Sequence, residues 1–143
     1  MAGRRIVAVI QPQFVPSDSW TGERVGPDRA AWAYPFRSMR DAGIPLALSS
    51  DAPVERANSF ACFSAVMNRA PWSPTGGLTF EETLHDYCLG SAYSLHAEHR
   101  LGSLESGKLA DFVVLSTDPT AISPTEIANV TADAVYVAGQ LAV

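Results

Sequence analysis

The sequence contains few cysteines and no cysteine motif. Its two cysteines, Cys62 and Cys88, lie far apart, and neither belongs to a CxxC pattern. Two buried, reduced thiols are typical of a protein in a reducing cytosol, and a single disulfide between them is the alternative. This cysteine usage favours a cytoplasmic protein.

Basic clusters and long apolar runs are also missing. The nearest approach to a basic run is Arg4–Arg5, and the formal net charge is −5. Nucleic acid and anionic membranes are therefore poor partners for this chain. The apolar run Ile6–Ile10 is too short for a secretory signal or a transmembrane helix. We expect a cytoplasmic protein with no nucleic-acid partner and no membrane partner.

What is present is the composition of a globular domain with a core, since 47% of the residues are hydrophobic and 17% are charged. Two apolar runs, Ile6–Ile10 and Pro45–Ser49, predict strands. The first run lacks polar alternation, which is typical of a strand buried on both faces in a parallel sheet. The segments around them predict a loop over 11–26, a helix over 27–41 that is kinked at Pro35 and capped by Gly43, a helix over 59–69 and a loop over 70–77.

The second half of the chain changes character. Thr79 and Glu82 form a capping-box pattern that predicts the start of a helix, which Gly90 interrupts before it continues to Leu95. The last forty residues predict strands over 111–116, 134–138 and 140–143, a tight turn at Gly139 and a second capping box over 123–126. The whole pattern predicts an α/β fold followed by a β-rich tail.

The three histidines do not form a recognisable metal motif. His96 and His99 have a spacing that can place both side chains on one helix face, while His85 lies elsewhere in the expected helix. A zinc site needs three or four ligands, and no HExxH motif is present. We interpret the histidines as surface or packing residues.

Three segments, in matching order and spacing, resemble one family. Val9–Phe14 (Val-Ile-Gln-Pro-Gln-Phe) is similar to that family's Q-P-x-F/H motif at the end of a seventh barrel strand. Asp41–Val54, which includes Ser-Ser-Asp-Ala-Pro-Val, is similar to the region around the eighth strand. Gly102–Leu115, with Gly-Lys-Leu-Ala-Asp at its centre, is similar to the crossing into a β appendage. The chain thus resembles the C-terminal portion of the amidohydrolase superfamily, in the branch of the N-substituted formamide deformylases.

The resemblance implies an α/β fold of a particular kind. Residues 1–101 would form the C-terminal part of a (β/α)8 TIM-type barrel, with its last two strands and the helices that follow them. Residues 102–143 would supply strands of a small β-sandwich appendage. In such a barrel the active site lies at the C-terminal ends of the strands.

The resemblance also implies a reaction. The family hydrolyses non-peptide C–N bonds of small amide-like substrates with a metal-activated water, and the divalent metal would be zinc. Asp51 falls on the position of the carboxylate that takes a proton from this water, hands it to the leaving amine and also touches the metal. Gln11 and Gln13 would line the substrate pocket at the mouth of the seventh strand.

These residues have ordinary structural interpretations too. Asp51 can simply stabilise the turn before Pro53, and Gln11 and Gln13 can be polar loop residues. Large aromatic side chains can shape an apolar substrate site or pack in the core and loops, and this applies to Trp20, Trp32 and Trp72. The chain departs from the family pattern at Ser49, where glycine is common, and at Cys88, where threonine often stands.

The resemblance further implies that this chain holds a small part of the metal site. The family's other ligands come from its first, fourth, fifth and sixth strands, which have no counterpart in this sequence. We therefore expect the isolated chain to be catalytically incompetent and to need the missing N-terminal half or a homo-oligomer. The two open strand edges favour such pairing. The alternative is a non-catalytic module that self-associates or binds a partner.

Overall fold

The computed structural model describes residues 6–68, 72 and 75–143. The first part of the chain holds the strands β1 (Ala8–Ile10) and β2 (Leu46–Leu48), the helices α1 (Phe14–Ser17), α2 (Thr21–Val25), α3 (Pro27–Ala30), α4 (Phe36–Asp41), α5 (Ser59–Met67), α6 (Phe80–His85) and α7 (Ser91–Ser94), and the π-helix η1 (Asp86–Gly90) between α6 and α7. The second part holds β3 (Phe112–Leu115), the 3₁₀ turn η2 (Ile127–Asn129), β4 (Ala132–Val137) and β5 (Gln140–Leu141). This order confirms mixed α/β structure with a β-rich tail. In the described part of the chain, no helix has both the length and the apolar character needed to cross a bilayer.

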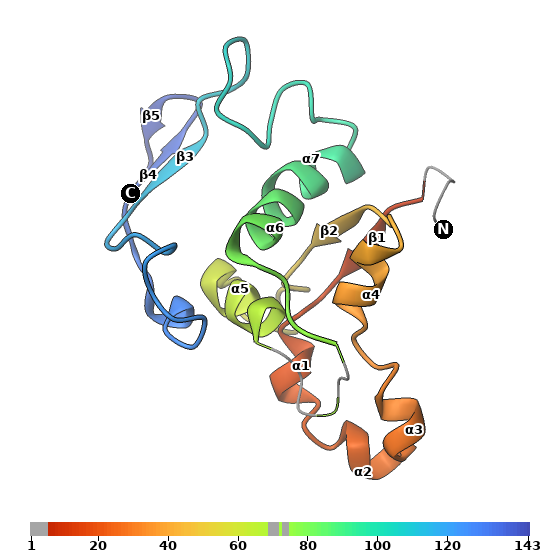
Figure 1. Ribbon diagram of the computed structural model, residues 1–143. Helices are drawn as coiled ribbons and strands as arrows, with labels where there is room; N and C mark the ends of the chain where they lie inside the picture. Colours follow the sequence, from red (N-terminus) through yellow and green to blue (C-terminus); the bar gives the residue numbers. More distant parts are fainter. Residues whose placement is uncertain (1–5, 69–71, 73–74) are drawn as a thin grey trace.

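β1 and β2 form a parallel two-stranded sheet at the centre of the first part (Figure 1). Ala8 lies opposite Leu46, and Ile10 lies opposite Leu48. All four side chains are buried, and they pack with Cys62 and Val66 of α5 and with residues of α1 and α4. Burial of this apolar face, at roughly 25 cal/mol per Å², is what holds the helices against the sheet.

The prediction that the first strand is buried on both faces is wrong for Val9. This side chain is 53% exposed, whereas Ala8 and Ile10 on either side of it are buried. Successive side chains of a strand point to opposite faces, and the described helices cover the face of β1 that carries Ala8 and Ile10. In β2, by contrast, Ala47 is also buried, since η1 lies against this strand.

Two predictions for the segment between the strands are corrected. The single kinked helix expected over 27–41 is two separate helices, α3 and α4, because the chain leaves the helical conformation at Tyr34, whose φ is +54°. The ring of Pro35 disfavours helical backbone at the residue before it. The loop expected over 11–26 contains α1 and α2, which are too short to show a helical periodicity in the sequence. The predicted cap is confirmed, since Gly43 has φ +69° and donates to the carbonyl of Arg40.

Helices α5 and α6 begin at side-chain caps. Asn58 accepts hydrogen bonds from the backbone of Phe60 and Ala61, both at 3.1 Å. The first predicted capping box is confirmed: Thr79 N–H donates to Glu82 at 2.8 Å, and Glu82 N–H donates to the Thr79 hydroxyl at 3.2 Å. The predicted loop over 70–77 and the end of the helix at Arg69 fall largely on residues 69–71 and 73–74, which lie outside the described residues.

Gly90 does not break the helical path. The backbone continues from α6 through η1 into α7, and Gly90 lies directly against β2. A Cβ atom at this position would lie only 2.1 Å from the carbonyl oxygen of Leu46. Close packing of helix on strand therefore requires glycine here.

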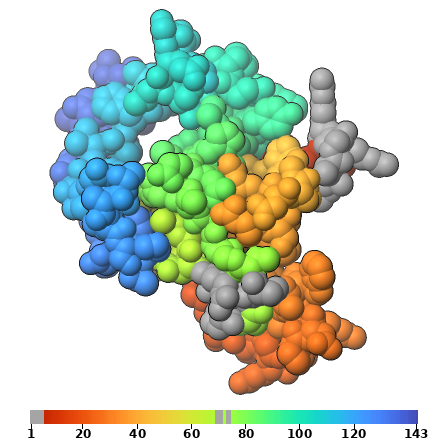
Figure 2. Space-filling view, in the orientation of Figure 1, coloured from red at the N-terminus to blue at the C-terminus, as the bar shows by residue number. Residues whose placement is uncertain are grey.

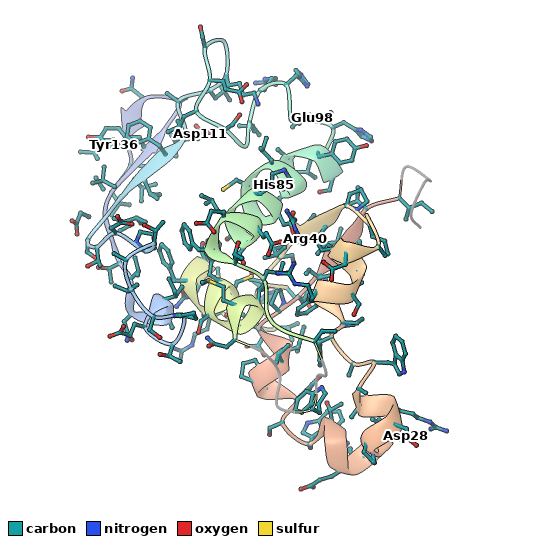
Figure 3. All side chains as sticks on the ribbon, in the orientation of Figure 1. Asp28, Arg40, His85, Glu98, Asp111 and Tyr136 are labelled. Carbon is teal, nitrogen blue, oxygen red and sulfur yellow. The ribbon has the colours of Figure 1, made fainter. Side chains whose placement is uncertain are left out.

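A group of charged side chains joins α4 to α6 and η1. The guanidinium of Arg37 donates to both oxygens of Glu82, at 2.9 and 2.5 Å, and Arg40 donates to the buried carboxylate of Asp86 at 2.5 Å. The bond to Arg37 is the main reason that the pKa of Glu82 falls from 4.5 to about 2. Arg40 and His85 mark these facing elements in Figure 3.

The tail forms an antiparallel sheet in the order β3-β4-β5. Phe112 stacks on Tyr136 with ring centroids 4.5 Å apart. The predicted tight turn is confirmed: Ala138 and Gly139 have φ values of +50° and +77°, which is the combination of a type I′ hairpin. The helix predicted from the second capping box does not form. Glu126 still accepts from Ser123 N–H at 3.1 Å, but the Ser123 hydroxyl pairs with Thr125, and only the short turn η2 follows.

The tail contacts the first part of the chain through η2 and through Gly102. η2 packs on α5, where Asn68 donates to the carbonyl of Pro124 at 3.0 Å. Gly102, with φ +89°, packs so closely on Cys88 that a Cβ would lie 2.9 Å from the Cys88 carbonyl oxygen. Between these places Figure 2 shows an opening between the tail and α6–α7. Both cysteines are unbonded, so the disulfide alternative is excluded in this structure. The boundary between residues 101 and 102 stays a prediction.

Candidate functional site

The parallel pairing brings the segments that follow β1 and β2 to the same end of the sheet. Ser49 N–H continues the ladder by donating to the carbonyl of Ile10 at 2.9 Å. Gln11 and Gln13 follow β1 directly, and Asp51 follows β2. In parallel α/β sheets this carboxyl end is where ligands bind. The structure thus places the three residues singled out in the sequence on neighbouring loops.

Asp51 has a strained backbone. Its φ is +58°, in the left-handed region that costs a non-glycine residue about 1 kcal/mol. Asp51 N–H donates to the hydroxyl of Ser49 at 3.2 Å, and Val54 N–H donates to the Asp51 carbonyl at 2.8 Å. The Ser49 side chain, which replaces the family's common glycine, therefore stabilises this turn. The Asp51 residue is exposed, and its carboxylate has no hydrogen-bond partner among the described residues.

Gln13 supports the loop that carries Asp51. Its side chain is buried, and its amide nitrogen donates to the carbonyl of Arg56 at 2.9 Å. A second hydrogen bond links the same two segments, since the Ser17 hydroxyl donates to the Glu55 carboxylate at 2.5 Å. The Gln13 amide nitrogen is already bonded within the protein, and the predicted substrate contact of Gln13 stays a prediction.

Gln11 borders an open hollow of about 410 Å³ at the carboxyl end of β1. Its wall is largely apolar and includes Phe14, Phe36 and Met39. Two polar residues of the wall, Asp18 and Tyr34, were not identified from the sequence. The Tyr34 hydroxyl donates to the Asp18 carboxylate, and burial together with this bond raises the pKa of Tyr34. No sequence motif marks either residue, because they meet through the break between α3 and α4.

The tryptophans have different surroundings. Trp72 packs against the core and lies 6.5 Å from the Tyr34 ring, measured between centroids. Trp20 is 41% exposed and stacks under the guanidinium of Arg24, whereas Trp32 is 76% exposed. None of the three lines the hollow beside Gln11.

The described residues do not provide a complete metal site. They contain no group of three or more His, Cys, Asp and Glu side chains arranged to hold a metal ion. His85, His96 and His99 are all exposed, and His85 contacts Asp86 at 3.0 Å. A zinc ion takes three or four protein ligands, so Asp51 alone does not fit such an ion. Any metal that this carboxylate touches must have most of its ligands elsewhere.

Comparison with known proteins identifies the family. The model of the amidohydrolase family matches residues 1–143. The protein YtcJ of Bacillus subtilis is 35% identical over 88% of this chain and 26% of its own length. N-substituted formamide deformylase of Arthrobacter pascens is 32% identical over 76% of this chain and 21% of its own length. The chain therefore spans about a fifth to a quarter of these relatives.

Solved structures agree with this result. The crystal structure of an uncharacterized metal-dependent hydrolase from Pyrococcus horikoshii OT3 superposes with a TM-score of 0.76 and 31% identity. The match covers 84% of this chain and 26% of that chain. The matched family, the curated relatives and the shared fold lead to one conclusion: this chain belongs to the amidohydrolase family.

Proposed function

We propose that this chain is the C-terminal portion of a metal-dependent amidohydrolase that hydrolyses a non-peptide C–N bond in a small amide-like substrate. In this proposal β1 and β2 are the last two strands of a (β/α)8 barrel, and β3–β5 belong to its β-sandwich appendage. The main support is Asp51, an exposed carboxylate on a strained turn at the carboxyl end of β2. Strained residues of this kind concentrate at functional sites.

Asp51 would act as the general base. Its carboxylate would accept a proton from the attacking water and pass that proton to the nitrogen of the departing amine. Because the Asp51 carboxylate has no hydrogen-bond partner among the residues that the structure describes, it is free to hold the water and then the amine. The hydrogen bonds from Gln13 to Arg56 and from Ser17 to Glu55 would hold the Asp51 loop in place.

The rest of the metal site would come from other polypeptide. The family relatives include metal-dependent hydrolases, and a divalent metal, with zinc as our proposal, would polarise the reacting group in the complete enzyme. Because Asp51 does not build this site with other described residues, the isolated chain would not catalyse hydrolysis. Gln11 would face the substrate from the hollow beside β1.

A chimera tests this proposal. The matched fifth of the Arthrobacter pascens deformylase is replaced by this chain, and formate release from N-substituted formamides is measured. Asp51→Asn preserves the size of the side chain and tolerates the left-handed backbone, but it removes the basic carboxylate. We expect at least a hundredfold loss of kcat with unchanged metal content.

Asp118→Asn is the matched control. Asp118 is an exposed aspartate in another turn, where it accepts from the Thr120 hydroxyl at 2.7 Å. We expect this control to keep the activity of the unmodified chimera. Normal turnover of the Asp51→Asn chimera would mean that Asp51 only stabilises its turn.

The second candidate is a non-catalytic interaction module. It is favoured by the apolar residues exposed on the tail sheet, which include Val113, Val137 and Leu141. Size-exclusion chromatography with light scattering at high concentration separates the two functions. A homo-oligomer that buries this sheet would support the module, and a monomer would contradict it. A cytoplasmic location stays a prediction in either case.

A further inference from the structure

Asp18 brings a negative charge to the hollow beside Gln11. The rest of the wall is apolar apart from Gln11 and Tyr34, and its described residues include no lysine, arginine or histidine. Asp18 also forms no ion pair with any residue that the structure describes. A carboxylate that borders an apolar wall without a neighbouring cation favours a positively charged ligand group.

Hydrogen bonds fix the backbone of Asp18 between α1 and α2. Its N–H donates to the carbonyl of Phe14 at 2.7 Å. Its own carbonyl accepts from the N–H of Thr21 at 2.9 Å and from the Thr21 hydroxyl at 2.8 Å. The short side chain of an aspartate has few staggered rotamers, so this backbone gives the carboxylate a narrow range of positions.

Tyr34 holds one oxygen of this carboxylate through a hydrogen bond from its hydroxyl. The Tyr34 ring is itself held in place, with centroids 5.9 Å from Phe36 and 6.5 Å from Trp72. Its backbone has φ +54°, and non-glycine residues keep such a conformation where the surrounding structure enforces it, often at functional sites. The raised pKa of Tyr34 keeps its hydroxyl protonated, so this group stays a donor to Asp18.

The second oxygen of the Asp18 carboxylate is left for a ligand. No described residue donates a hydrogen bond to it, since the bond from Tyr34 ends on the other oxygen. Asp18 is partly buried, and the apolar wall around it reduces the water that would screen its charge. The same wall offers aromatic rings and a methionine, which suit the hydrocarbon part of a ligand and attract cations.

The segment 11–18 connects the hollow to the loop of the proposed general base. It contributes Gln11 and Asp18 to the wall, and two hydrogen bonds join it to the loop that carries Asp51. Pairing of further strands with this sheet involves the edge of Ala8–Ile10, whereas Asp18 belongs to a segment that follows the strand. A group bound at Asp18 therefore lies at the same end of the sheet as Asp51.

We propose that this hollow is the subsite for a substituent of the amide-like substrate, and that Asp18 selects a substituent with a cationic group on an apolar spacer. This inference rests on the proposed function, and it narrows the substrate to amide-like molecules that carry a protonated amine or a guanidinium group. The cation pairs with the free oxygen of Asp18, and the spacer lies against Phe14 and Met39. Tyr34 is a positioning residue, because it holds the carboxylate and carries no charge. The volume of about 410 Å³ falls in the range of small-molecule sites.

Equilibrium binding to the 143-residue chain tests the proposal without any turnover. The probes are phenethylammonium and phenethyl alcohol, which share a ring and a spacer and differ in charge. Titration followed by NMR measures both affinities and maps them onto the amides of Gln11, Phe14 and Asp18. We expect phenethylammonium to bind about tenfold more tightly than the alcohol, since its hydrogen bond to the carboxylate is charge-assisted.

Two variants separate charge from position. Asp18→Asn keeps the size of the side chain and removes its charge, so the two probes should bind within about twofold of each other. Tyr34→Phe keeps the charge and releases the carboxylate, so the preference should fall roughly threefold without vanishing. A purely structural disturbance would weaken both probes equally, and the ratio of the two affinities would not change.

Asp28→Asn is the matched control. Asp28 is an exposed aspartate on α3, labelled in Figure 3, and it does not line the hollow. This variant loses the same charge as Asp18→Asn and should keep the tenfold preference of the unmodified chain. Circular dichroism of each variant checks the fold.

Several results would overturn the proposal. Equal affinities of the unmodified chain for the two probes would mean that the hollow does not select a cation. A preference that survives Asp18→Asn, or shifts confined to amides away from the hollow, would place the cation elsewhere. Equal losses of preference in Asp18→Asn and Asp28→Asn would trace the effect to the negative charge of the whole chain. An unchanged preference in Tyr34→Phe would remove Tyr34 as a positioning residue.

The chimera with the deformylase separates this inference from the proposed function. Its substrates are the formamide of phenethylamine and the para-aminomethyl derivative of that formamide, which is cationic at pH 7. We expect the ratio of kcat/KM for the cationic and neutral formamides to fall about tenfold with Asp18→Asn. If formate is released and this ratio does not change, the proposed activity stands and the subsite falls. If phenethylammonium binding depends on Asp18 but the chimera releases no formate, the cation site stands and the proposed activity falls.

Discussion

Acid should weaken this protein through one carboxylate, Glu82. In the unfolded chain this group binds a proton near its ordinary pKa of 4.5, whereas in the folded chain it stays ionised down to about pH 2. The full stabilisation is therefore present above pH 4.5 and is lost progressively between pH 4.5 and 2. This difference in pKa corresponds to about 3 kcal/mol. Because a quarter of the side chain is exposed, we reduce the figure to about 2 kcal/mol.

Glu82→Gln isolates this contribution. Glutamine can still accept the Thr79 N–H of the capping box, but it loses the charge that faces Arg37. Urea unfolding followed by circular dichroism should show the variant about 2 kcal/mol less stable at pH 7, with the gap closing as the pH falls below 4.5. Glu126→Gln is the control, since Glu126 also accepts a backbone N–H but is exposed, and it should cost less than about 0.5 kcal/mol. A gap of constant size from pH 7 to pH 3 would refute the assignment.

Two further predictions concern packing. Gly90→Ala should lower the free energy of unfolding by about 3 kcal/mol, because the new Cβ would collide with the backbone of Leu46. Gly22→Ala is the control, since no atom lies within 4 Å of its new Cβ, and it should raise the free energy of unfolding by up to about 1 kcal/mol. Equal unfolding midpoints for the two variants would contradict the close contact. Burial raises the pKa of Cys62 to about 12, so in a Cys88→Ser variant iodoacetamide at pH 8 should modify Cys62 only after unfolding, as mass spectrometry can measure. Modification within minutes in native buffer would be inconsistent with a buried thiol.

The elements that could be predicted from the sequence are those with a local chemical cause. The capping box at Thr79 and the hairpin turn at Gly139 depend on a few adjacent residues, and both appear where expected. The second capping box has the same pattern, a hydroxyl residue followed three positions later by glutamate, yet its serine pairs with Thr125, and the turn is not extended into a helix. A cap can start a helix only if the following face finds something to pack on.

The exposure of Val9 could not be predicted in this way. Its apolar run has the composition of a strand with neighbours on both sides, but composition does not reveal which neighbours are present. The same limit applies to Tyr34 and Asp18, which are 16 positions apart and meet only because the chain turns sharply before Pro35. Asp51, Gln11 and Gln13 were found because motif resemblance marks them, while their roles remain predictions.

The π-helix η1 holds one extra residue between two helices. Each residue of an α-helix turns its direction by about 100° around the axis. A π turn closes its hydrogen bond one residue later than an α turn, so removing one residue before Gly90 in η1 would restore ordinary α-helical winding and leave α7 in nearly its present direction relative to α6. Ser91 would stay against β2, and Ala92 would keep its place beside Gly102. A single-codon deletion in η1 would thus be absorbed within the helix, whereas the same deletion in α6 would rotate everything after it by about 100°.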